Sequence, residues 1–241
     1  MALENDSETR TEVIAGTTGE AASGSALPKA SGAASVSLVL DLAGLEELLS
    51  EDELLRAARF HFEADRVRWV RARASLRMIL ASYADVPARE VRFATGTHGK
   101  PFLVDRSGVR RGVEFSLSHS GKWAMVAVTE NVPVGIDIER IRENVDMAAL
   151  LRRLGEKDLP EGRTSLFNAW ARREAMTKAL GGALMEAPLG DLRPCHLSAP
   201  TGYVAALALV GHHPEVRYCS ALVPDPGTTL GPNKLGLTQP M

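Results

Sequence analysis

Three strand-like runs follow one another between residues 113 and 139, and this cluster constrains the fold more than any other feature of the chain. Val113–Leu117 and Val134–Glu139 carry strand signals, and Trp123–Val128 is apolar enough to be a buried strand. Asn131, Val132 and Pro133 predict a turn before the last of these runs. Helical patterns lie on both sides of the cluster, without regular strand–helix–strand alternation, so we expect an α+β fold.

The helical patterns have recognisable starts and stops. Ser50 followed by Glu53 is a capping box, and it predicts a helix that runs on through Phe60. Gly181 and Gly182 are expected to end the last helix. The other helices are expected over Ala64–Tyr83, Asp146–Leu154 and Ser165–Leu180, and further strands over Val36–Leu42, Val91–Ala94, Tyr203–Val210 and Val216–Val223.

Composition sets the outer limits of the fold and excludes several classes of protein. Residues 1–35 and 224–241 hold few large apolar side chains in a regular pattern, so we expect both to be disordered tails around a core of 36–223. A formal net charge of −2 gives no sign of a nucleic-acid binder. The chain shows neither an apolar run of about 18 residues nor a signal-peptide pattern, so no membrane span is expected. With two cysteines only, the expected protein is cytoplasmic with reduced thiols.

The run Gly135–Arg140, GIDIER, is the sharpest chemical feature. Side chains alternate across a strand, so Asp137 and Glu139 share one face while Ile136 and Ile138 face a core. Two neighbouring carboxylates repel one another, and oxygen ligands at this spacing suit Mg²⁺ together with substrate phosphates. An isolated D-x-E is also consistent with two ordinary surface acids.

A helical stripe and a basic region add candidate residues. Phe167, Trp170, Glu174 and Lys178 fall on one face of the expected helix and could form a cleft wall, although a Glu→Lys pair at this spacing is also common on surfaces. Ser118 and His119, in the run SLSHSG, could hold an anion at a strand end. Arginines crowd the two helices between residues 50 and 83, and a Gly-Lys-Pro loop follows at Gly99, Lys100 and Pro101, as expected of a phosphate-binding surface or of a solvated helical face.

These motifs, in this order, resemble the Sfp-type 4′-phosphopantetheinyl transferases. The most specific parts are GIDIER at Gly135–Arg140 and FNAWARREAMTKALG at Phe167–Gly181. The resemblance implies two structurally similar halves packed as an intramolecular pseudo-dimer, here 36–132 and 133–223, with the active site in the cleft between them. It also implies transfer of the phosphopantetheine arm of coenzyme A to a serine of an acyl or peptidyl carrier protein, with adenosine 3′,5′-bisphosphate as the by-product.

The resemblance also assigns roles by position. Asp137, Glu139 and Glu174 would ligate Mg²⁺, Glu174 would be the base for the carrier serine, and Lys178 would neutralise the pyrophosphate. The residues expected to contact coenzyme A are Arg56, Gly99, Lys100, Pro101, Ser118, His119 and Lys178.

The chain departs from the family pattern at two residues. Arg173 replaces the lysine that many members have beside the catalytic glutamate, and Glu53 lies where a basic contact to coenzyme A can occur. We expect a monomer without nucleic-acid or membrane partners. Two rival functions stay open at this point: a non-catalytic module that binds coenzyme A or a carrier protein, and a Mg²⁺-dependent hydrolase of nucleotide pyrophosphates.

Overall fold

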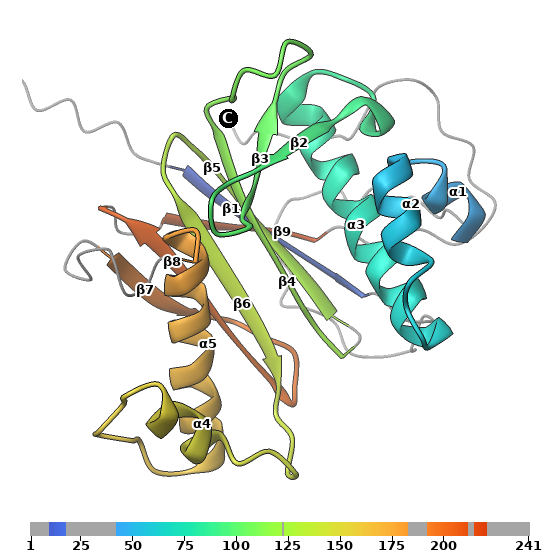
Figure 1. Ribbon diagram of the computed structural model, residues 1–241. Helices are drawn as coiled ribbons and strands as arrows, with labels where there is room; N and C mark the ends of the chain where they lie inside the picture. The colour runs from blue at the N-terminus through green and yellow to red at the C-terminus, as the bar shows by residue number, and fades with distance from the viewer. Residues whose placement is uncertain (1–9, 18–41, 122, 183–191, 212–214, 221–241) are drawn as a thin grey trace, which may run out of the picture.

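A computed structural model describes residues 10–17, 42–121, 123–182, 192–211 and 215–220, and these form an α+β fold (Figure 1). The helices are α1 (Leu42–Glu46), α2 (Glu51–Ala57), α3 (Glu63–Ala84), α4 (Met147–Arg153) and α5 (Arg163–Ala179), with one 3₁₀ turn at Ala88–Glu90. The strands are β1 (Arg10–Thr17), β2 (Arg92–Thr95), β3 (Pro101–Val104), β4 (Val113–Ser120), β5 (Trp123–Glu130), β6 (Val134–Arg140), β7 (Leu192–Leu197), β8 (Tyr203–Val210) and β9 (Glu215–Ser220).

Two sheets form the centre of the molecule, and one long helix covers the outer face of each (Figure 1). The first sheet has the order β4-β5-β1-β9, and the second has the order β6-β8-β7. Strands β2 and β3 make a separate hairpin near α3. Among the described helices, none is long and apolar enough to cross a membrane.

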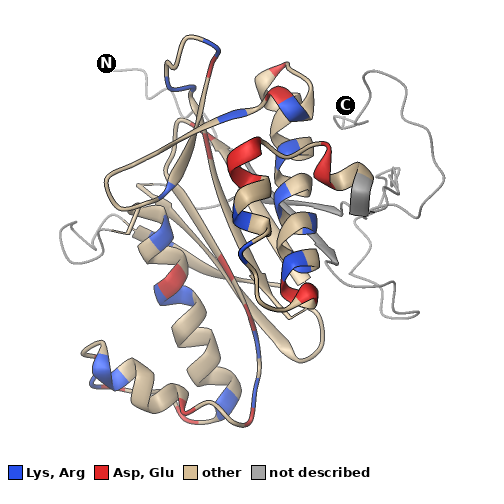
Figure 2. Ribbon diagram, turned by 45° about the vertical axis from the view of Figure 1, so that its right-hand side comes forward, with Lys and Arg blue, Asp and Glu red and all other residues tan. Residues whose placement is uncertain are grey.

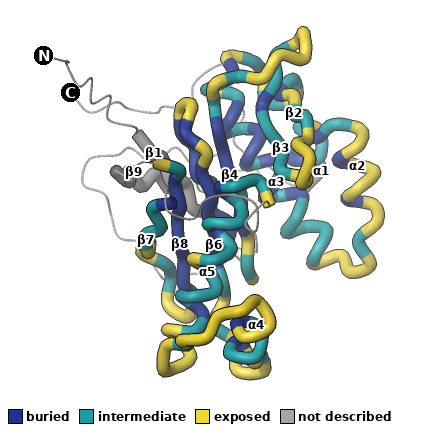
Figure 3. The backbone as a smooth tube through the Cα atoms, turned by 60° about the vertical axis from the view of Figure 1, so that its left-hand side comes forward, coloured by how far each residue is buried: buried dark blue, intermediate teal, exposed yellow. Residues whose placement is uncertain are grey.

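Strand β5 explains why residues 123–128 are apolar throughout. Trp123 and Met125 pack against the second sheet, while Val126 and Val128 pack under α3. Both faces of β5 are therefore buried, which is why apolar side chains occupy consecutive positions. Strands β6 and β8 of the second sheet are also mostly buried (Figure 3).

Strands β4 and β6 meet along a seam between the two sheets. The Oγ atoms of Ser116, Ser118 and Ser120 accept hydrogen bonds from the backbone N–H groups of Ile136, Ile138 and Arg140, at 3.1, 3.3 and 3.0 Å. The partner numbers rise together along both strands, so β4 and β6 run parallel. Serine hydroxyls thus join the two sheets, whereas the strands within a sheet are joined by hydrogen bonds between backbone groups.

Most of the elements expected from the sequence are confirmed. The Ser50–Glu53 capping box opens α2, with the Ser50 N–H donating to Glu53 Oε2 at 2.8 Å. Helix α5 ends just before Gly181 and Gly182, whose φ values of 70° and 97° favour glycine. Helix α2 ends at Ala57, so the expected continuation through Phe60 is wrong.

Other elements differ from expectation for identifiable reasons. Residues 10–17 form β1 between β5 and β9, although a disordered tail is expected there. The expectation is wrong because the surrounding segment consists mostly of small residues, which obscure a short strand-forming run. The strand expected over 36–42 lies outside the described residues except for Leu42, which begins α1. Strands β3 and β7 are not among the strands expected from the sequence, and each contains a proline. Pro101 begins β3, and Pro194 lies on an edge strand, two positions where proline is tolerated. The expected tail at 224–241 lies outside the described residues.

Candidate active site

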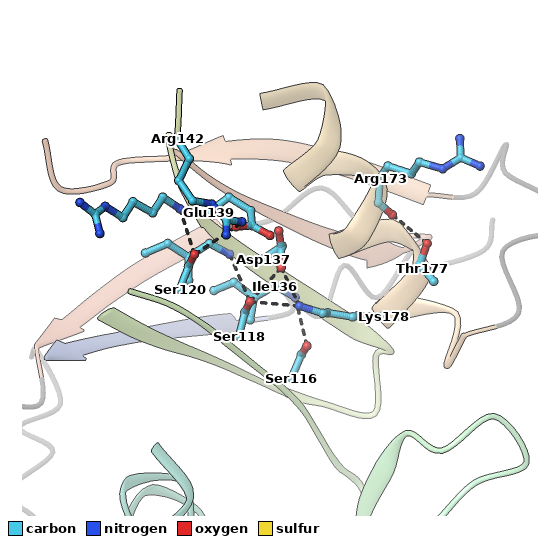
Figure 4. A network of polar contacts seen from close by, with 12 residues as sticks. Ser116, Ser118, Ser120, Ile136, Asp137, Glu139, Arg142, Arg173, Thr177 and Lys178 are labelled. Atoms are coloured by element: carbon cyan, nitrogen blue, oxygen red, sulfur yellow. Dashed lines mark hydrogen bonds and ion pairs between the residues drawn. The ribbon is translucent and has the colours of Figure 1, made fainter. Parts of the chain in front are cut away.

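Strand β6 separates an apolar face from an acidic one. Ile136 and Ile138 are buried in the core between the sheets, as the alternation in GIDIER predicts. Asp137 lies on the opposite face, where its carboxylate accepts a hydrogen bond from Lys178 of α5. The strand therefore presents its carboxylates to α5 (Figure 4).

Gly135 allows α5 to approach this acidic face closely. A Cβ atom at this position would lie 1.9 Å from the Ala175 carbonyl oxygen and 2.4 Å from the Ala179 nitrogen. No side chain fits such a gap, so glycine is required for the helix to lie directly on the strand. Ala175 and Ala179 immediately follow Glu174 and Lys178. The close contact at Gly135 therefore also sets how near to β6 these two charged side chains lie.

Asp137 is the centre of a buried polar network. Its Oδ1 atom accepts hydrogen bonds from the Lys178 Nζ at 2.6 Å and from the Ser118 Oγ at 2.8 Å. The residue is only 3% exposed, and its Oδ2 atom is a buried oxygen that no described group hydrogen-bonds. A buried carboxylate oxygen without a donor is costly, so this atom is available to a ligand that supplies positive charge or a proton.

The carboxylates of Glu139 and Glu174 belong to the same electrostatic cluster. Burial, followed by the negative charge of Asp137, raises the pKa of both groups. Burial also raises the pKa of Asp137 itself, against the opposing effect of Lys178. The three carboxylates share Lys178, and Arg142 lies 3.8 Å from Glu139 as a second cation, so bound positive charge would further favour their ionised forms.

The donor chemistry fits a divalent cation, although the side chains are not gathered around one point. Carboxylate oxygens are the protein ligands that Mg²⁺ prefers, and the unpartnered Oδ2 of Asp137 can accept one. In the described part of the chain, no three His, Cys, Asp or Glu side chains lie close enough to ligate one ion. Asp137 interacts electrostatically with both Glu139 and Glu174, so one or two of these carboxylates together with substrate phosphates could supply the oxygens for an ion.

A cavity of about 1070 Å³ lies next to this cluster. Its lining includes most of the residues that the sequence assigned to coenzyme A, namely Arg56, Gly99, Lys100, Pro101, His119 and Lys178. Ser118 is not among the lining residues, and its Oγ instead contacts Asp137 and the Ile138 N–H. Lys178 lines the cavity and also binds Asp137, so the carboxylates lie at its Lys178 end.

One wall of the cavity is basic, and Glu53 holds it together. The Glu53 carboxylate accepts from Arg73 and from Arg77 Nε, the latter at 2.6 Å. Burial opposes ionisation of Glu53, but Arg73, the Ser50 N–H and Arg77 together lower its pKa. Glu53 therefore holds the Arg73 and Arg77 guanidinium groups in place. It does not itself supply the basic contact to coenzyme A that can occur at this position in the family. Arginines at successive turns of α3 are visible as blue bands in Figure 2.

Lys100 joins three elements around the cavity. Its Nζ donates to the Val134 carbonyl at 2.9 Å and to the Ala179 carbonyl at 3.5 Å, at the start of β6 and the end of α5. Burial lowers the pKa of Lys100 to about 8. Its charge is thus sensitive to pH in the slightly alkaline range.

The remaining residues singled out in the sequence lie elsewhere. Phe167, a residue of α5, is fully buried in the core between α5 and the second sheet and does not form a cleft wall. Arg173 donates to Glu156 at 2.7 Å and to the Leu154 carbonyl at 3.1 Å, so it points away from Asp137 (Figure 4).

Trp69 and Phe93 line the cavity and were not expected there. The Trp69 ring centre lies 5.6 Å from the Arg56 guanidinium carbon, and the Phe93 ring centre lies 4.2 Å from that of Arg73. The sequence signal that could have placed them in the cavity is an aromatic residue near a cluster of arginines.

Comparison with known proteins connects this geometry to one family. Residues 40–131 match the model of the 4′-phosphopantetheinyl transferase N-terminal region. The transferase HetI of Nostoc sp. is 36% identical over 152 residues, which cover 59% of this chain and 64% of HetI. The transferase psf-1 of Bacillus pumilus is 33% identical over 145 residues, covering 57% and 60% of the two chains.

A third relative carries the name used for the resemblance. Sfp of Bacillus subtilis is 25% identical over 143 residues, covering 56% of this chain and 62% of Sfp. The chain thus aligns with about three-fifths of the length of these relatives. The family model and these three named transferases agree on one family, and the chain is similar to the 4′-phosphopantetheinyl transferase superfamily over the part that they cover.

Proposed function

We propose that the protein transfers the 4′-phosphopantetheine arm of coenzyme A to a serine of an acyl or peptidyl carrier protein. The observation that carries this proposal is the double position of Lys178. Its side chain lines the large basic-walled cavity and also binds Asp137 at the acidic cluster. A nucleotide with several phosphates suits the cavity, and its pyrophosphate would then lie beside the carboxylates.

The reaction is a phosphoryl transfer. The serine hydroxyl oxygen of the carrier attacks the phosphorus that bears the pantetheine arm, and the phosphorus–oxygen bond to adenosine 3′,5′-bisphosphate breaks. Such reactions depend on in-line positioning and charge neutralisation more than on covalent help from the protein.

Glu174 is suited to accept the serine proton. Burial and the nearby Asp137 raise the pKa of its carboxyl group, which makes the ionised form a stronger base. Lys178 would neutralise charge on the departing bisphosphate, and His119 and Arg56 would contact the nucleotide from the cavity wall.

Asp137, Glu139 and Glu174 would hold Mg²⁺ at the pyrophosphate. When bound, the ion would neutralise the phosphoryl oxygens and orient the leaving group. The unpartnered Oδ2 of Asp137 and the electrostatic interaction of Glu139 and Glu174 with Asp137 support this assignment.

The arrangement of the fold supports the two-halved organisation. One long helix packs on the outer face of each sheet, and the sheets meet at the seam between β4 and β6. The cavity is lined from both sides of that seam, by α2, α3 and the β2–β3 hairpin and by the end of α5. We therefore propose a pseudo-dimer with its site in the cleft. That the protein is a monomer and that it is cytoplasmic stay predictions. Size-exclusion chromatography with light scattering tests whether it is a monomer.

The test measures release of adenosine 3′,5′-bisphosphate from coenzyme A and Mg²⁺, with and without an apo carrier protein. A transferase releases the product only when the carrier is present. Release without a carrier would instead support the pyrophosphate hydrolase. Coenzyme A binding without release, across fatty-acid, polyketide and peptide carriers, would support the binding module.

A further inference from the structure

The three serines of the seam are chemically equivalent toward the backbone of β6. Ser116, Ser118 and Ser120 occupy alternate positions of β4, and each Oγ accepts one N–H bond from β6. The bonds to Ile136 and Ile138 are buried, whereas the bond to Arg140 is exposed. As a device for joining two strands, each serine performs the same task.

Two of the three serines have a second task. The Ser118 Oγ donates to Asp137 Oδ1 at 2.8 Å, and the Ser120 Oγ donates to Glu139 Oε2 at 3.0 Å. Each hydroxyl thus accepts from one backbone N–H and spends its single proton on the carboxylate of the preceding residue of β6. Ser118 also accepts from Lys178 at 3.0 Å, which fills its second acceptor position.

Ser116, which also lines the cavity, has no acidic residue opposite it. The residue that precedes Ile136 is Gly135, which has no carboxylate to accept a proton. The seam therefore contains its own internal control: the same residue type and backbone contact, with and without an acidic partner (Figure 4).

We propose that Ser118 and Ser120 are positioning residues that orient Asp137 and Glu139 as ligands for a divalent cation. This inference rests on the metal site in the proposed function. A hydroxyl that holds one oxygen of a carboxylate restricts rotation of the group and leaves the other oxygen free to ligate. For Asp137 the free atom is the unpartnered Oδ2. Hydrogen-bonded supports of this kind typically contribute about 10–100-fold to metal affinity.

The experiment compares Ser120→Ala with Ser116→Ala in the full chain. Mn²⁺ is titrated into each protein in the presence of coenzyme A, and free Mn²⁺ is followed by electron paramagnetic resonance. Global stability is measured in parallel by urea unfolding without metal. Neither readout depends on catalytic turnover.

The two variants should give opposite orders in the two measurements. Ser120→Ala should weaken Mn²⁺ binding about tenfold, because Glu139 loses its support. Ser116→Ala should change it by less than about twofold, yet lower stability more, because it leaves the buried Ile136 N–H without its acceptor. Ser118→Ala should weaken Mn²⁺ binding at least as much as Ser120→Ala.

The outcomes separate this inference from the proposed function. Equal Mn²⁺ affinity in the wild type and Ser120→Ala would overturn the positioning role while leaving the metal site intact. Equal weakening by Ser116→Ala and Ser120→Ala would reduce both serines to structural contacts. No Mn²⁺ binding by the wild type would overturn the metal site and, with it, the inference.

Discussion

Replacing Gly135 by alanine tests whether the close contact between α5 and β6 sets the geometry of the site. The new Cβ would lie 1.9 Å from the Ala175 carbonyl oxygen, where ordinary contact begins at 3.4 Å. The difference of 1.5 Å must be met by displacing the helix, since the opposing atoms are backbone. A comparable shift would stretch the 2.6 Å bond between Lys178 and Asp137 to about 4 Å, beyond hydrogen-bonding range.

Two consequences follow for Gly135→Ala. Overpacking of this size costs about 1–3 kcal/mol of unfolding free energy, measured by urea titration. Misplacement of Glu174 and Lys178 by about 1 Å should lower the rate of transfer to a carrier about 100-fold. The rate is measured by intact mass of the carrier over time, under conditions where the variant is fully folded.

Gly112→Ala is the matched control. Its Cβ would also come close to another atom, at 2.3 Å, but that atom is the end of the Asn131 side chain, which can move aside. Stability should change by no more than about 0.5 kcal/mol, and transfer should be unaffected. The account is refuted if Gly135→Ala folds with wild-type stability and transfers at the wild-type rate.

Two further predictions concern charged residues of the cavity. Because the pKa of Lys100 is lowered to about 8, its charge is lost as pH rises above 8, and coenzyme A affinity measured by calorimetry should fall several-fold between about pH 7 and 9.5. Lys100→Arg, which stays charged, should remove that pH dependence, and identical profiles would contradict the assignment. The folded protein also binds fewer protons at Lys100 than the unfolded chain between pH 8 and 10.5, so this residue makes stability rise with pH across that range. Glu53→Ala should lower the unfolding free energy by about 3–5 kcal/mol because it leaves Arg73 and Arg77 without their carboxylate, whereas Glu63→Ala, at an exposed pair, should have a much smaller effect. Similar losses in the two variants would contradict the role of Glu53.

Local patterns in the sequence predicted the elements that carry the site. The alternation in GIDIER correctly separated Ile136 and Ile138 from Asp137, because side-chain direction on a strand depends only on position. The capping box and the paired glycines located the start of α2 and the end of α5, since both act within a few residues. The sequence was less able to predict which residues contact one another across the fold. The sequence suggests that Ser118 could hold an anion at a strand end, and the structure shows its Oγ donating to the carboxylate of Asp137.

The failures have physical reasons of the same kind. Phe167 shares a helical stripe with Glu174 and Lys178, but α5 lies so close to β6 and β8 that this part of the stripe is core. Glu53 looked like a lost basic contact because sequence alone does not show that Arg73 and Arg77, about twenty residues later, converge on it. Strand β1 escaped detection because its partners β5 and β9 lie more than a hundred residues away.

The most direct test of the central claim is the intact mass of an apo carrier protein incubated with this protein, coenzyme A and Mg²⁺. The wild type should add one phosphopantetheine arm to the carrier, and EDTA should prevent the addition. Asp137→Asn and Glu174→Gln should fold normally and add none, since each removes one carboxylate from the cluster beside the cavity. Full transfer by either variant, or by the wild type in EDTA, would contradict the assignment of this cluster as the metal-dependent transfer site.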